Sequence, residues 1–254
     1  MSTEISFFKT VQEPRIEHCE KHGQYESRNQ VGKIWTICPK CNAKESANRA
    51  AAEKAREELE RISAFEKKLG TAGIPPRFLD RTFASYEATS SGQQQAAEMA
   101  LKLAQEINAG NGASAIFCGK PGTGKTHLAV AVGHNVIKAG KTVLFITVQR
   151  MVRRVKDSWR SESKESESDV VRLLVQPDLL ILDEIGVQFG TDFEKNLLFD
   201  VLNERYENRK STLLLSNLTA NEVRAFLGDR VFDRLREDGG KCVPFTWDSH
   251  RGRA

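Results

Sequence analysis

Hydrophobic and polar positions alternate in two ways over the last two thirds of the chain. Short apolar runs are separated by stretches in which apolar residues recur every three to four positions. A bounded apolar run predicts a buried strand, and the longer spacing predicts an amphipathic helix. Strands are expected at 113–118, 142–147, 179–183, 212–216 and 242–246, and helices at 93–109, 127–139, 148–159, 169–175, 194–208 and 221–236. This alternation is typical of a parallel sheet with crossover helices, so the predicted fold class is α/β.

The N-terminal part follows a different pattern. Residues 1–45 show little core-forming periodicity, and residues 46–69 predict a helix rich in Ala, Glu, Lys and Arg. The apolar stripe of this helix consists of Ala55, Leu59, Ile62, Phe65 and Leu69. Glycines and prolines between residues 70 and 76 then end the helix. We therefore expect a small module at 1–45, a helix and linker at 46–75, and a main domain at 76–254.

Composition fits this division without changing it. The 254 residues are 39% hydrophobic and 28% charged, with a net charge of +4 and a pI near 8.8. A mildly basic chain is compatible with a nucleic-acid partner but does not require one. No apolar run approaches the ~20 residues that span a bilayer, and the N-terminus lacks a signal-peptide core. We expect a cytoplasmic protein without membrane contact, in which Cys118 and Cys242 are inert core thiols.

One octapeptide indicates a nucleotide site. Residues 119–126 read Gly-Lys-Pro-Gly-Thr-Gly-Lys-Thr and lie between a predicted strand and a predicted helix. In that context Gly-x4-Gly-Lys-Ser/Thr predicts a phosphate loop rather than an ordinary glycine-rich turn. Lys125 is expected to reach the β- and γ-phosphates of ATP, and the Thr126 hydroxyl to hold Mg²⁺. The predicted phosphate-binding residues are Gly119, Lys120, Pro121, Gly122, Thr123, Gly124, Lys125, Thr126 and His127.

An acidic pair supplies the second half of this site. The aliphatic run 179–182 ends in Asp183 and Glu184. We expect Asp183 to bind Mg²⁺ and Glu184 to polarise the attacking water, which favours hydrolysis over simple nucleotide binding. Asn217, after the strand at 212–216, is expected to orient that water beside the γ-phosphate. The alternatives are a solvated strand end for the acidic pair and a turn residue for Asn217.

A metal site is predicted near the N-terminus. Cys19 and His22 form a Cys-x2-His pair, and fifteen residues later Cys38 and Cys41 form a Cys-x2-Cys pair. Two such pairs fit a structural tetrahedral Zn²⁺, with all four positions filled by protein ligands. His18 adjoins Cys19 and remains an alternative to His22. The other alternative is a set of unpaired thiols.

The nucleotide motifs together resemble one family. The phosphate loop, the acidic pair, Asn217, the segment Leu-Gly-Asp-Arg-Val-Phe-Asp-Arg-Leu-Arg at 227–236 and the ending at 245–251 are similar to AAA+ ATPases of the DnaC helicase-loader group. The resemblance runs from about residue 74 to the C-terminus, and IstB-type transposition ATPases share the same core. It implies an AAA+ P-loop fold with a five-stranded parallel sheet flanked by helices, added to the zinc module and linker helix. It also implies an ATPase switch that self-assembles with ATP and loads a DnaB-type replicative helicase onto single-stranded DNA.

The same resemblance implies roles for three arginines. Arg234 lies where the family keeps an arginine finger, which stabilises the transferring phosphoryl group from a neighbouring subunit. Arg230, one helical turn earlier, is the second choice. Arg251 is a weaker candidate for sensing nucleotide in cis. The alternative for Arg234 and Arg230 is a pair of surface arginines on an amphipathic helix.

Two helices are candidates for partner contacts. The helix at 46–69 either docks onto the helicase, as the resemblance implies for the N-terminal region, or serves as a solvated spacer. In the helix at 148–160, Arg153, Arg154 and Lys156 are expected to track a DNA backbone, the alternative being a solvated basic face. The residues expected in the core on its other face are Met151, Val152, Val155 and Trp159.

Two other functions compete with helicase loading. An IstB-like ATPase would mark duplex DNA for a transposase, whereas the tethered N-terminal module favours gripping a second protein. A P-loop small-molecule kinase is disfavoured because Glu184 suits the activation of water. Kinases also carry an arginine-rich lid that shields ATP, and no segment has that composition.

Overall fold

The computed structural model describes residues 13–31, 34–186, 192–237 and 240–250, without the side chains of 30, 31, 55 and 57–71. The chain divides into two compact units, Met1–Ser63 and Ala64–Ala254. The predicted division at residues 45 and 75 stays a prediction. Within the described residues, no helix combines the length and the apolar character needed to cross a membrane.

The first unit contains two short antiparallel ribbons. Strand β1 (Arg15–Cys19) pairs with β2 (Gly23–Ser27), and β3 (Asn29–Val31) pairs with β4 (Ile34–Trp35). Helix α1 (Pro39–Thr71) begins seven residues before the predicted start at 46. A proline suits the first turn of a helix, because that position needs no N–H donor. The predicted apolar stripe of this helix lies outside the described side chains.

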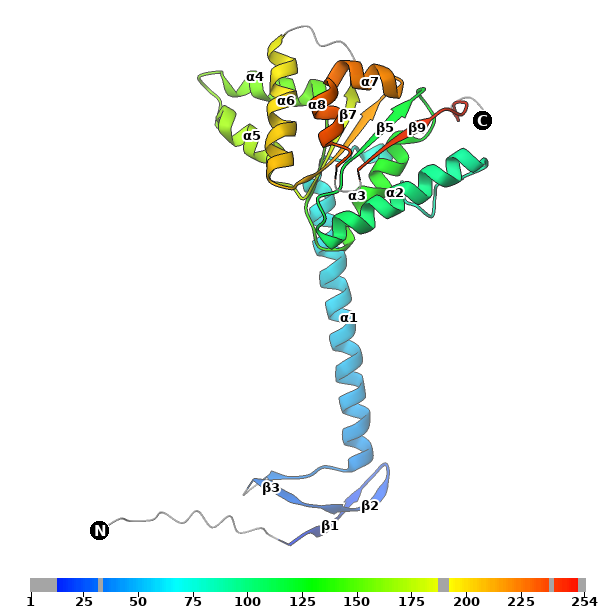
Figure 1. Cartoon of the computed structure of the whole chain (residues 1–254). Helices are drawn as coiled ribbons and strands as arrows, with labels where there is room; N and C mark the ends of the chain where they lie inside the picture. The colour runs from blue at the N-terminus through cyan, green and yellow to red at the C-terminus, as the bar shows by residue number, and fades with distance from the viewer. Residues whose placement is uncertain (1–12, 32–33, 187–191, 238–239, 251–254) are drawn as a thin grey trace, which may run out of the picture. The chain divides into compact units, whose positions relative to one another are not determined.

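Five parallel strands form the sheet of the second unit, in the order β6-β7-β8-β5-β9 (Figure 1). Their bounds are β5 (Ala115–Gly119), β6 (Val143–Thr147), β7 (Leu179–Ile185), β8 (Ser211–Ser216) and β9 (Lys241–Phe245). All five predicted strands are present within two residues of their expected ends. The carboxyl ends of parallel strands share one edge of a sheet, so the segments after β5, β7 and β8 lie near one another.

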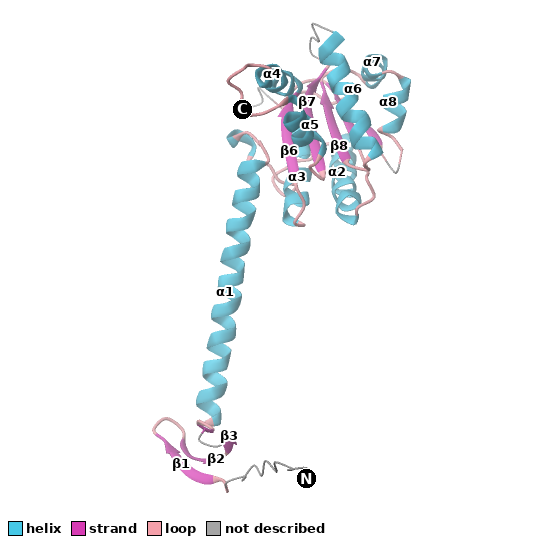
Figure 2. Cartoon of the chain, turned by 90° about the vertical axis from the view of Figure 1, so that its left-hand side faces the viewer, coloured by secondary structure: helices cyan, strands magenta, loops and turns pink. Residues whose placement is uncertain are grey.

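Helices cover both faces of this sheet (Figure 2). They are α2 (Ser91–Ala109), α3 (Lys125–Lys138), α4 (Val148–Ser158), α5 (Glu167–Val175), α6 (Asp192–Glu207), α7 (Ala220–Leu227) and α8 (Asp229–Arg234), with a short 3-10 turn, η1 (Pro76–Phe78), before α2. Alternate strand residues point to opposite faces: Phe117 and Ile181 pack with α2 and α3, whereas Ile116 and Leu180 pack with α4 to α8. Burial of both faces explains why these strands read as continuous apolar runs.

Three predictions about helices need correction. The helix expected at 221–236 is divided into α7 and α8 by Gly228, whose φ of 75° and ψ of 156° are not helical. The helix expected at 169–175 begins two residues earlier, at Glu167, because Ser166 caps α5. Trp159 is not a core residue: it is 53% exposed, its Nε1 donates to Glu167, and its ring meets Phe193 edge-on.

Candidate nucleotide site and metal cluster

The glycine loop connects the end of β5 to the start of α3. Its three glycines, Gly119, Gly122 and Gly124, have φ values of +126°, +76° and +96°. A side chain is strained in such conformations, and at Gly119 a Cβ would also lie 2.3 Å from the Phe245 carbonyl oxygen. At Gly124 a Cβ would lie 2.9 Å from Tyr86. The loop therefore needs glycine at these places to turn its backbone close to its neighbours.

Lys125 is folded into this loop. Its side chain is buried, and its Nζ donates to the carbonyls of Gly119 and Lys120 at 2.6 and 2.7 Å. Thr123 Oγ1 donates to the same Lys120 carbonyl. The ammonium group is thus held beside the turn that would receive phosphates, where a phosphate oxygen is a stronger acceptor than these carbonyls.

The acidic pair lies next to the loop because β7 and the start of α3 meet. Thr126 Oγ1 donates to Asp183 Oδ2 at 3.3 Å, and the Glu184 amide donates to Asp183 Oδ1 at 2.8 Å. Burial is the largest influence on Asp183 and raises its pKa. Hydroxyl and carboxylate oxygens are the ligands that Mg²⁺ prefers, and a bound cation would favour the ionised form that burial disfavours. Thr126 and Asp183 therefore fit a Mg²⁺ site.

A β-bulge places Glu184. Leu182 pairs with Leu214, and Ile185 with Ser216, so two residues of β7 oppose one residue of β8. Glu184 is exposed and has a φ of 66°, a conformation that costs a non-glycine residue on the order of 1–3 kcal/mol. Ser216 holds the bulge, because its buried hydroxyl donates to the Ile185 carbonyl at 2.7 Å. The carboxylate of Glu184 is thereby turned out of the strand instead of packing on a sheet face.

Strand order brings Asn217 to the same edge. It directly follows β8, which lies between β7 and β5, so it comes between the acidic pair and the loop. Asn217 is exposed. The sequence alone did not define this neighbourhood, because the order of strands in a sheet is not their order along the chain.

Side chains that sequence reasoning missed surround the loop. Tyr86, from the segment before α2, packs edge-on against His127 with ring centroids 5.1 Å apart. His127 Nε2 lies 3.0 Å from the Thr82 carbonyl oxygen, so the predicted phosphate residue His127 contacts this segment of the protein. Among the described residues the buried Tyr86 hydroxyl has no hydrogen-bond partner, and burial raises its pKa to about 12. No sequence motif indicated that Tyr86 would lie beside the phosphate loop.

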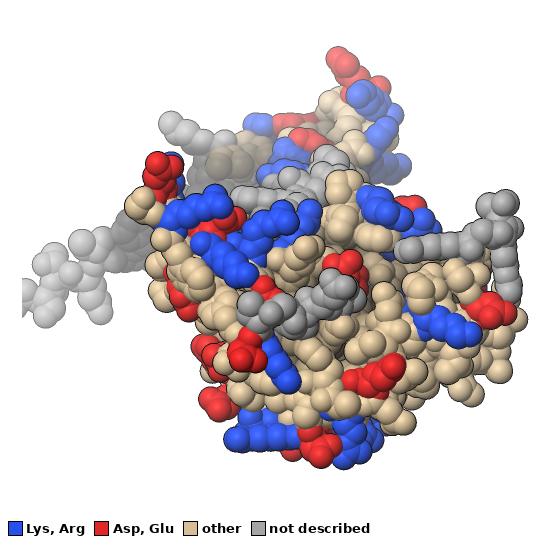
Figure 3. All heavy atoms as spheres, turned by 90° about the horizontal axis from the view of Figure 1, so that it is seen from above, with Lys and Arg blue, Asp and Glu red and all other residues tan. Residues whose placement is uncertain are grey.

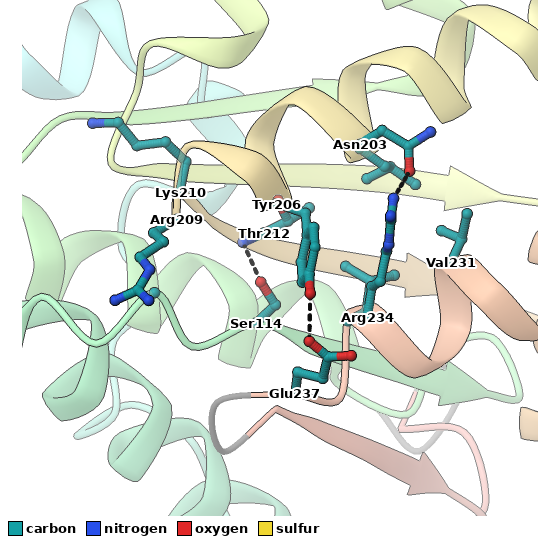
Figure 4. Close-up of a pocket in the computed structure, with 12 residues that line it drawn as sticks. Ser114, Asn203, Tyr206, Arg209, Lys210, Thr212, Val231, Arg234 and Glu237 are labelled. Atoms are coloured by element: carbon teal, nitrogen blue, oxygen red, sulfur yellow. Dashed lines mark hydrogen bonds between the residues drawn. The ribbon is translucent and has the colours of Figure 1, made fainter.

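Arg234 lies away from the loop of its own chain. Its Nη1 donates to Asn203 Oδ1 at 2.7 Å, and its guanidinium stacks over the Tyr206 ring at 4.7 Å (Figure 4). The pocket that it lines also includes Ser114 and Thr212, at the amino ends of β5 and β8. The phosphate loop follows the opposite end of β5, so Arg234 lies at the far end of this strand from the loop of its own chain.

Of the other two predicted arginines, Arg230 lies within the described residues and Arg251 does not. Arg230 is exposed, and within the described residues no ion pair or hydrogen bond of its side chain is found. Arg251 lies outside the described residues. The structure therefore shows one partly buried and bonded arginine and one exposed arginine on α8.

The predicted DNA-contacting residues occupy α4. Figure 3, seen from above Figure 1, shows Lys and Arg side chains grouped on part of the visible surface, with acidic side chains beside them. Arg154 makes a bidentate pair with Glu165 at 2.6 and 3.0 Å, and Lys156 pairs with Glu194 at 2.8 Å. Arg153 is exposed. The three cations are therefore not equally available to an incoming phosphate.

The four predicted metal ligands come together in the first unit. The ligand atoms of Cys19, His22, Cys38 and Cys41 all lie within 4.8 Å of one another. His22 Nδ1 lies 3.3 to 3.7 Å from the three Sγ atoms, and the Sγ atoms of Cys19 and Cys41 are 3.6 Å apart. Three thiols and one imidazole in this arrangement fit a tetrahedral Zn²⁺. His18 does not belong to the cluster: it lies on β1, opposite Gln24, and is exposed.

Local structure explains how the ligands meet. Cys19 ends β1, and His22 lies in the turn before β2, so the hairpin brings the first pair to one end. Cys38 and Cys41 stand on either side of the start of α1. The Lys21 backbone is the largest influence that lowers the pKa of Cys19, to about 6, which favours the thiolate that binds metal.

The structure has a strand, a glycine loop and a helix in succession, with an acidic strand end beside the loop. Together with the strand order β6-β7-β8-β5-β9 of the parallel sheet, these features define a P-loop ATPase fold of the AAA+ class. Residues 51–252 match the family model described as IstB-like ATP binding protein, and the chain belongs to this family. It is 37% identical over 199 residues to the Replicative helicase loader DnaC of Escherichia coli (strain K12), covering 78% of this chain and 80% of that protein.

Solved structures agree on the fold. The crystal structure of the DnaC helicase loader matches with a TM-score of 0.59 at 22% identity, covering 67% of this chain and 99% of that one. AMPPCP-bound DnaA from Aquifex aeolicus matches with a TM-score of 0.55 at 22% identity, covering 67% and 50%. The predicted family and fold class are confirmed, and membership of an ATPase family implies nucleotide binding with Mg²⁺.

Proposed function

We propose that this protein is an ATP-driven loader that binds a replicative ring helicase and places it on single-stranded DNA. The observation that carries the proposal is the 37% identity to a replicative helicase loader across four fifths of that protein. Helicase loading is thus inferred from sequence similarity to a helicase loader. ATP hydrolysis, which would drive loading, is inferred from the phosphate loop and the acidic pair.

At the site, the loop and the start of α3 bind the phosphates of ATP. Backbone N–H groups and the Lys125 ammonium neutralise the β- and γ-phosphates, and Thr126 and Asp183 hold Mg²⁺. A bound Mg²⁺ would offset the negative charge of the phosphates during their transfer. Glu184, turned outward by its bulge, polarises the attacking water, and Asn217 orients it.

Assembly completes the site. Arg234 of one molecule approaches the nucleotide of the next, because it lies at the far end of β5 from its own loop. ATP would then hold neighbouring molecules together, and hydrolysis would release them. In this way cleavage of ATP becomes a switch between assembled and separated states, with helicase and DNA retained or released accordingly.

The N-terminal unit is the proposed grip on the helicase. It has its own cluster of candidate metal ligands, and its exposed apolar side chains include Ile16, Ile34 and Ile37, which are 52–68% exposed. Exposed apolar residues on so small a unit suit contact with another protein better than contact with solvent. The zinc-stabilised module and α1 are therefore assigned to the partner, and the ATPase domain to nucleotide and DNA.

The direct test is a loading assay on closed circular single-stranded DNA. Purified protein, ATP–Mg²⁺ and a DnaB-type helicase are incubated with the circles, and the helicase that remains on DNA after gel filtration is measured. We expect retention that depends on both the protein and ATP. Equal retention without the protein would refute the loader. Stimulated strand transfer by an IS21-type transposase instead would establish the IstB-like alternative, and a phosphorylated small molecule would establish the kinase.

A second test concerns the single-stranded DNA contact. Because Arg154 is already paired with Glu165 whereas Arg153 is exposed, we expect Arg153→Glu to weaken ATP-dependent DNA binding more than Arg154→Glu does. Charge reversal of a phosphate contact should also make the salt dependence of binding less steep. Fluorescence anisotropy with labelled oligonucleotide at several salt concentrations measures both effects. Unchanged DNA affinity for both variants at low salt would exclude α4 from the interface.

A further inference from the structure

The segment that follows β9 lies directly against the back of the phosphate loop. Trp247 Nε1 donates to the Thr123 carbonyl at 2.9 Å, and the His250 backbone N–H donates to the Gly122 carbonyl at 2.9 Å. The sheet creates this proximity, because β9 pairs with β5 up to Gly119, opposite Phe245. Two consecutive carbonyls of the loop thus have donors from near the C-terminal end of the chain.

Packing fixes the Trp247 indole in this position. Its ring meets the Phe245 ring with centroids 4.8 Å apart, and a Cβ at Gly92 would lie 3.3 Å from its Cε3 atom. The first turn of α2 therefore approaches one side of the indole, which only a glycine at 92 allows without displacement. Trp247 is half-buried, so its N–H is directed by neighbours from both β9 and α2.

Because of peptide geometry, these two hydrogen bonds also fix the direction of two N–H groups that can bind phosphate. In a trans peptide the C=O and the following N–H point to opposite sides of the chain, and the described residues contain no cis peptide bond. The His250 N–H holds the Gly122 carbonyl on the side of the loop that faces the segment after β9, so the Thr123 N–H points to the opposite side of the loop. The Trp247 indole holds the Thr123 carbonyl in the same way, so the Gly124 N–H also points to that opposite side. Successive N–H groups presented together form the concavity that binds anions.

We propose that Trp247 and the His250 backbone are positioning groups of the ATP site, which hold two peptide units of the phosphate loop with their N–H groups toward the phosphates. This inference rests on the proposed ATP site and extends it to a segment outside the phosphate-loop and acidic-pair motifs. Both groups donate to carbonyls of the loop itself, so they act on phosphate affinity by preorganising the loop. Binding of the nucleoside part has no such dependence.

The first test is Trp247→Phe in the full-length protein. Phenylalanine keeps an aromatic ring against Phe245 and Gly92 but has no N–H, so one neutral hydrogen bond is lost. We expect ATP and ADP affinity to fall about fivefold, and adenosine affinity to stay the same. Displacement of a fluorescent ATP analogue measures all three ligands, including weak adenosine binding. Trp159→Phe is the matched control, because its indole bonds Glu167 on α5, far along the chain from the loop.

The second test isolates the backbone donor. His250→Pro removes the N–H that bonds the Gly122 carbonyl, whereas His250→Ala removes the side chain and keeps that N–H. We expect the proline variant to lose ATP affinity about fivefold and the alanine variant to keep it. A merely structural tail would not distinguish the two variants by ligand, since both would alter adenosine and ATP binding alike.

The outcomes separate this inference from the proposed function. ATP affinity within about twofold of the unaltered protein in both Trp247→Phe and His250→Pro overturns it, as does an equal loss for ATP and adenosine. If the unaltered protein itself fails to bind ATP–Mg²⁺ in the same titration, it is the proposed function that fails. Loss confined to phosphate-bearing ligands, present in the proline and absent in the alanine variant, establishes the positioning role.

Discussion

Replacing Arg234 with alanine is expected to slow ATP turnover by about 10³-fold or more while ATP–Mg²⁺ affinity changes little. A cation placed on the transferring phosphoryl group offsets charge that develops in the transition state, and its loss therefore affects kcat rather than binding. Arg234 is at the opposite end of β5 from its own loop, so removing it leaves that loop and its Lys125 intact. Phosphate release and nucleotide titration on the same preparations measure the two quantities.

Three companion variants make this prediction specific. Arg236→Ala is a matched control, being an exposed arginine two residues further on. Arg230→Ala tests the second candidate, and a larger loss there than in Arg234→Ala would reverse the assignment. Asn203→Ala removes the partner that Arg234 bonds within its own chain. If Arg234 acts only by supporting α6, then Asn203→Ala should slow turnover as much as Arg234→Ala does. If Arg234 instead acts on the transferring phosphoryl group, the turnover of Asn203→Ala should stay close to that of the unaltered protein.

Mixing defective molecules tests whether the site is shared. A Glu184→Gln protein lacks the group that polarises water but keeps Arg234, and an Arg234→Ala protein has the reverse defect. At an interface between them, the nucleotide held by the Arg234→Ala molecule has both an intact Glu184 and an arginine from its neighbour. Turnover should therefore exceed that of either protein alone. A mixture that stays as slow as its components would place Arg234 in its own active site or outside catalysis.

Sequence patterns predicted the fold closely because both faces of the sheet are buried. Strands β5, β6, β7 and β8 each contain a continuous apolar run, which differs clearly from the three-to-four-residue spacing of the helices. The split of the last helix was missed because Gly228 is compatible with either a continuous helix or a break, and only its backbone angles decide. The β1–β4 strands were missed because they are two to five residues long and mostly polar.

The site was predictable where it depends on local motifs and not where it depends on long-range contacts. The loop, the acidic pair and the four metal ligands were identified from spacing, and the structure brings each set together. The bulge that turns Glu184 outward depends on pairing with β8, which no local pattern encodes. Trp247 meets Thr123 from 124 residues away in the chain, so its contact is a product of strand order.

The contacts of a buried arginine, Arg205, also could not be predicted from local sequence. Arg205 is fully buried, and its guanidinium donates to the carbonyls of Leu174, Val175, Pro177 and Ser211 and to the Thr212 hydroxyl. It connects the end of α5 to the start of β8, with carbonyl oxygens taking the place of a carboxylate partner. From sequence it is one more basic residue on α6, because its partners come from other segments of the chain.

Removing the metal from the N-terminal unit is expected to unfold that unit and to abolish helicase capture, while ATP binding by the other unit persists. The buried side chains in the described part of the first unit are Cys38 and Ser27, so we expect its folding free energy to depend on a metal bound by the cluster. In zinc-finger peptides that contribution is on the order of 10 kcal/mol. Chelation should change the fluorescence of Trp35, which stacks under Arg15, and should release zinc in a one-to-one ratio with protein.

The two neighbouring histidines decide whether the cluster is responsible. His22→Ala removes an imidazole whose Nδ1 lies 3.3 Å from Cys41 Sγ, whereas His18→Ala removes one that is exposed and outside the cluster. Zinc content, the Trp35 signal and helicase pull-down should all be lost in His22→Ala and kept in His18→Ala. The core of the ATPase domain is separate, with its own buried strands, so the nucleotide titration should be the same for both. A metal-free His22→Ala protein that still captures helicase would remove the cluster from partner binding, and a Trp35 signal that chelation leaves unchanged would show that the unit folds without zinc.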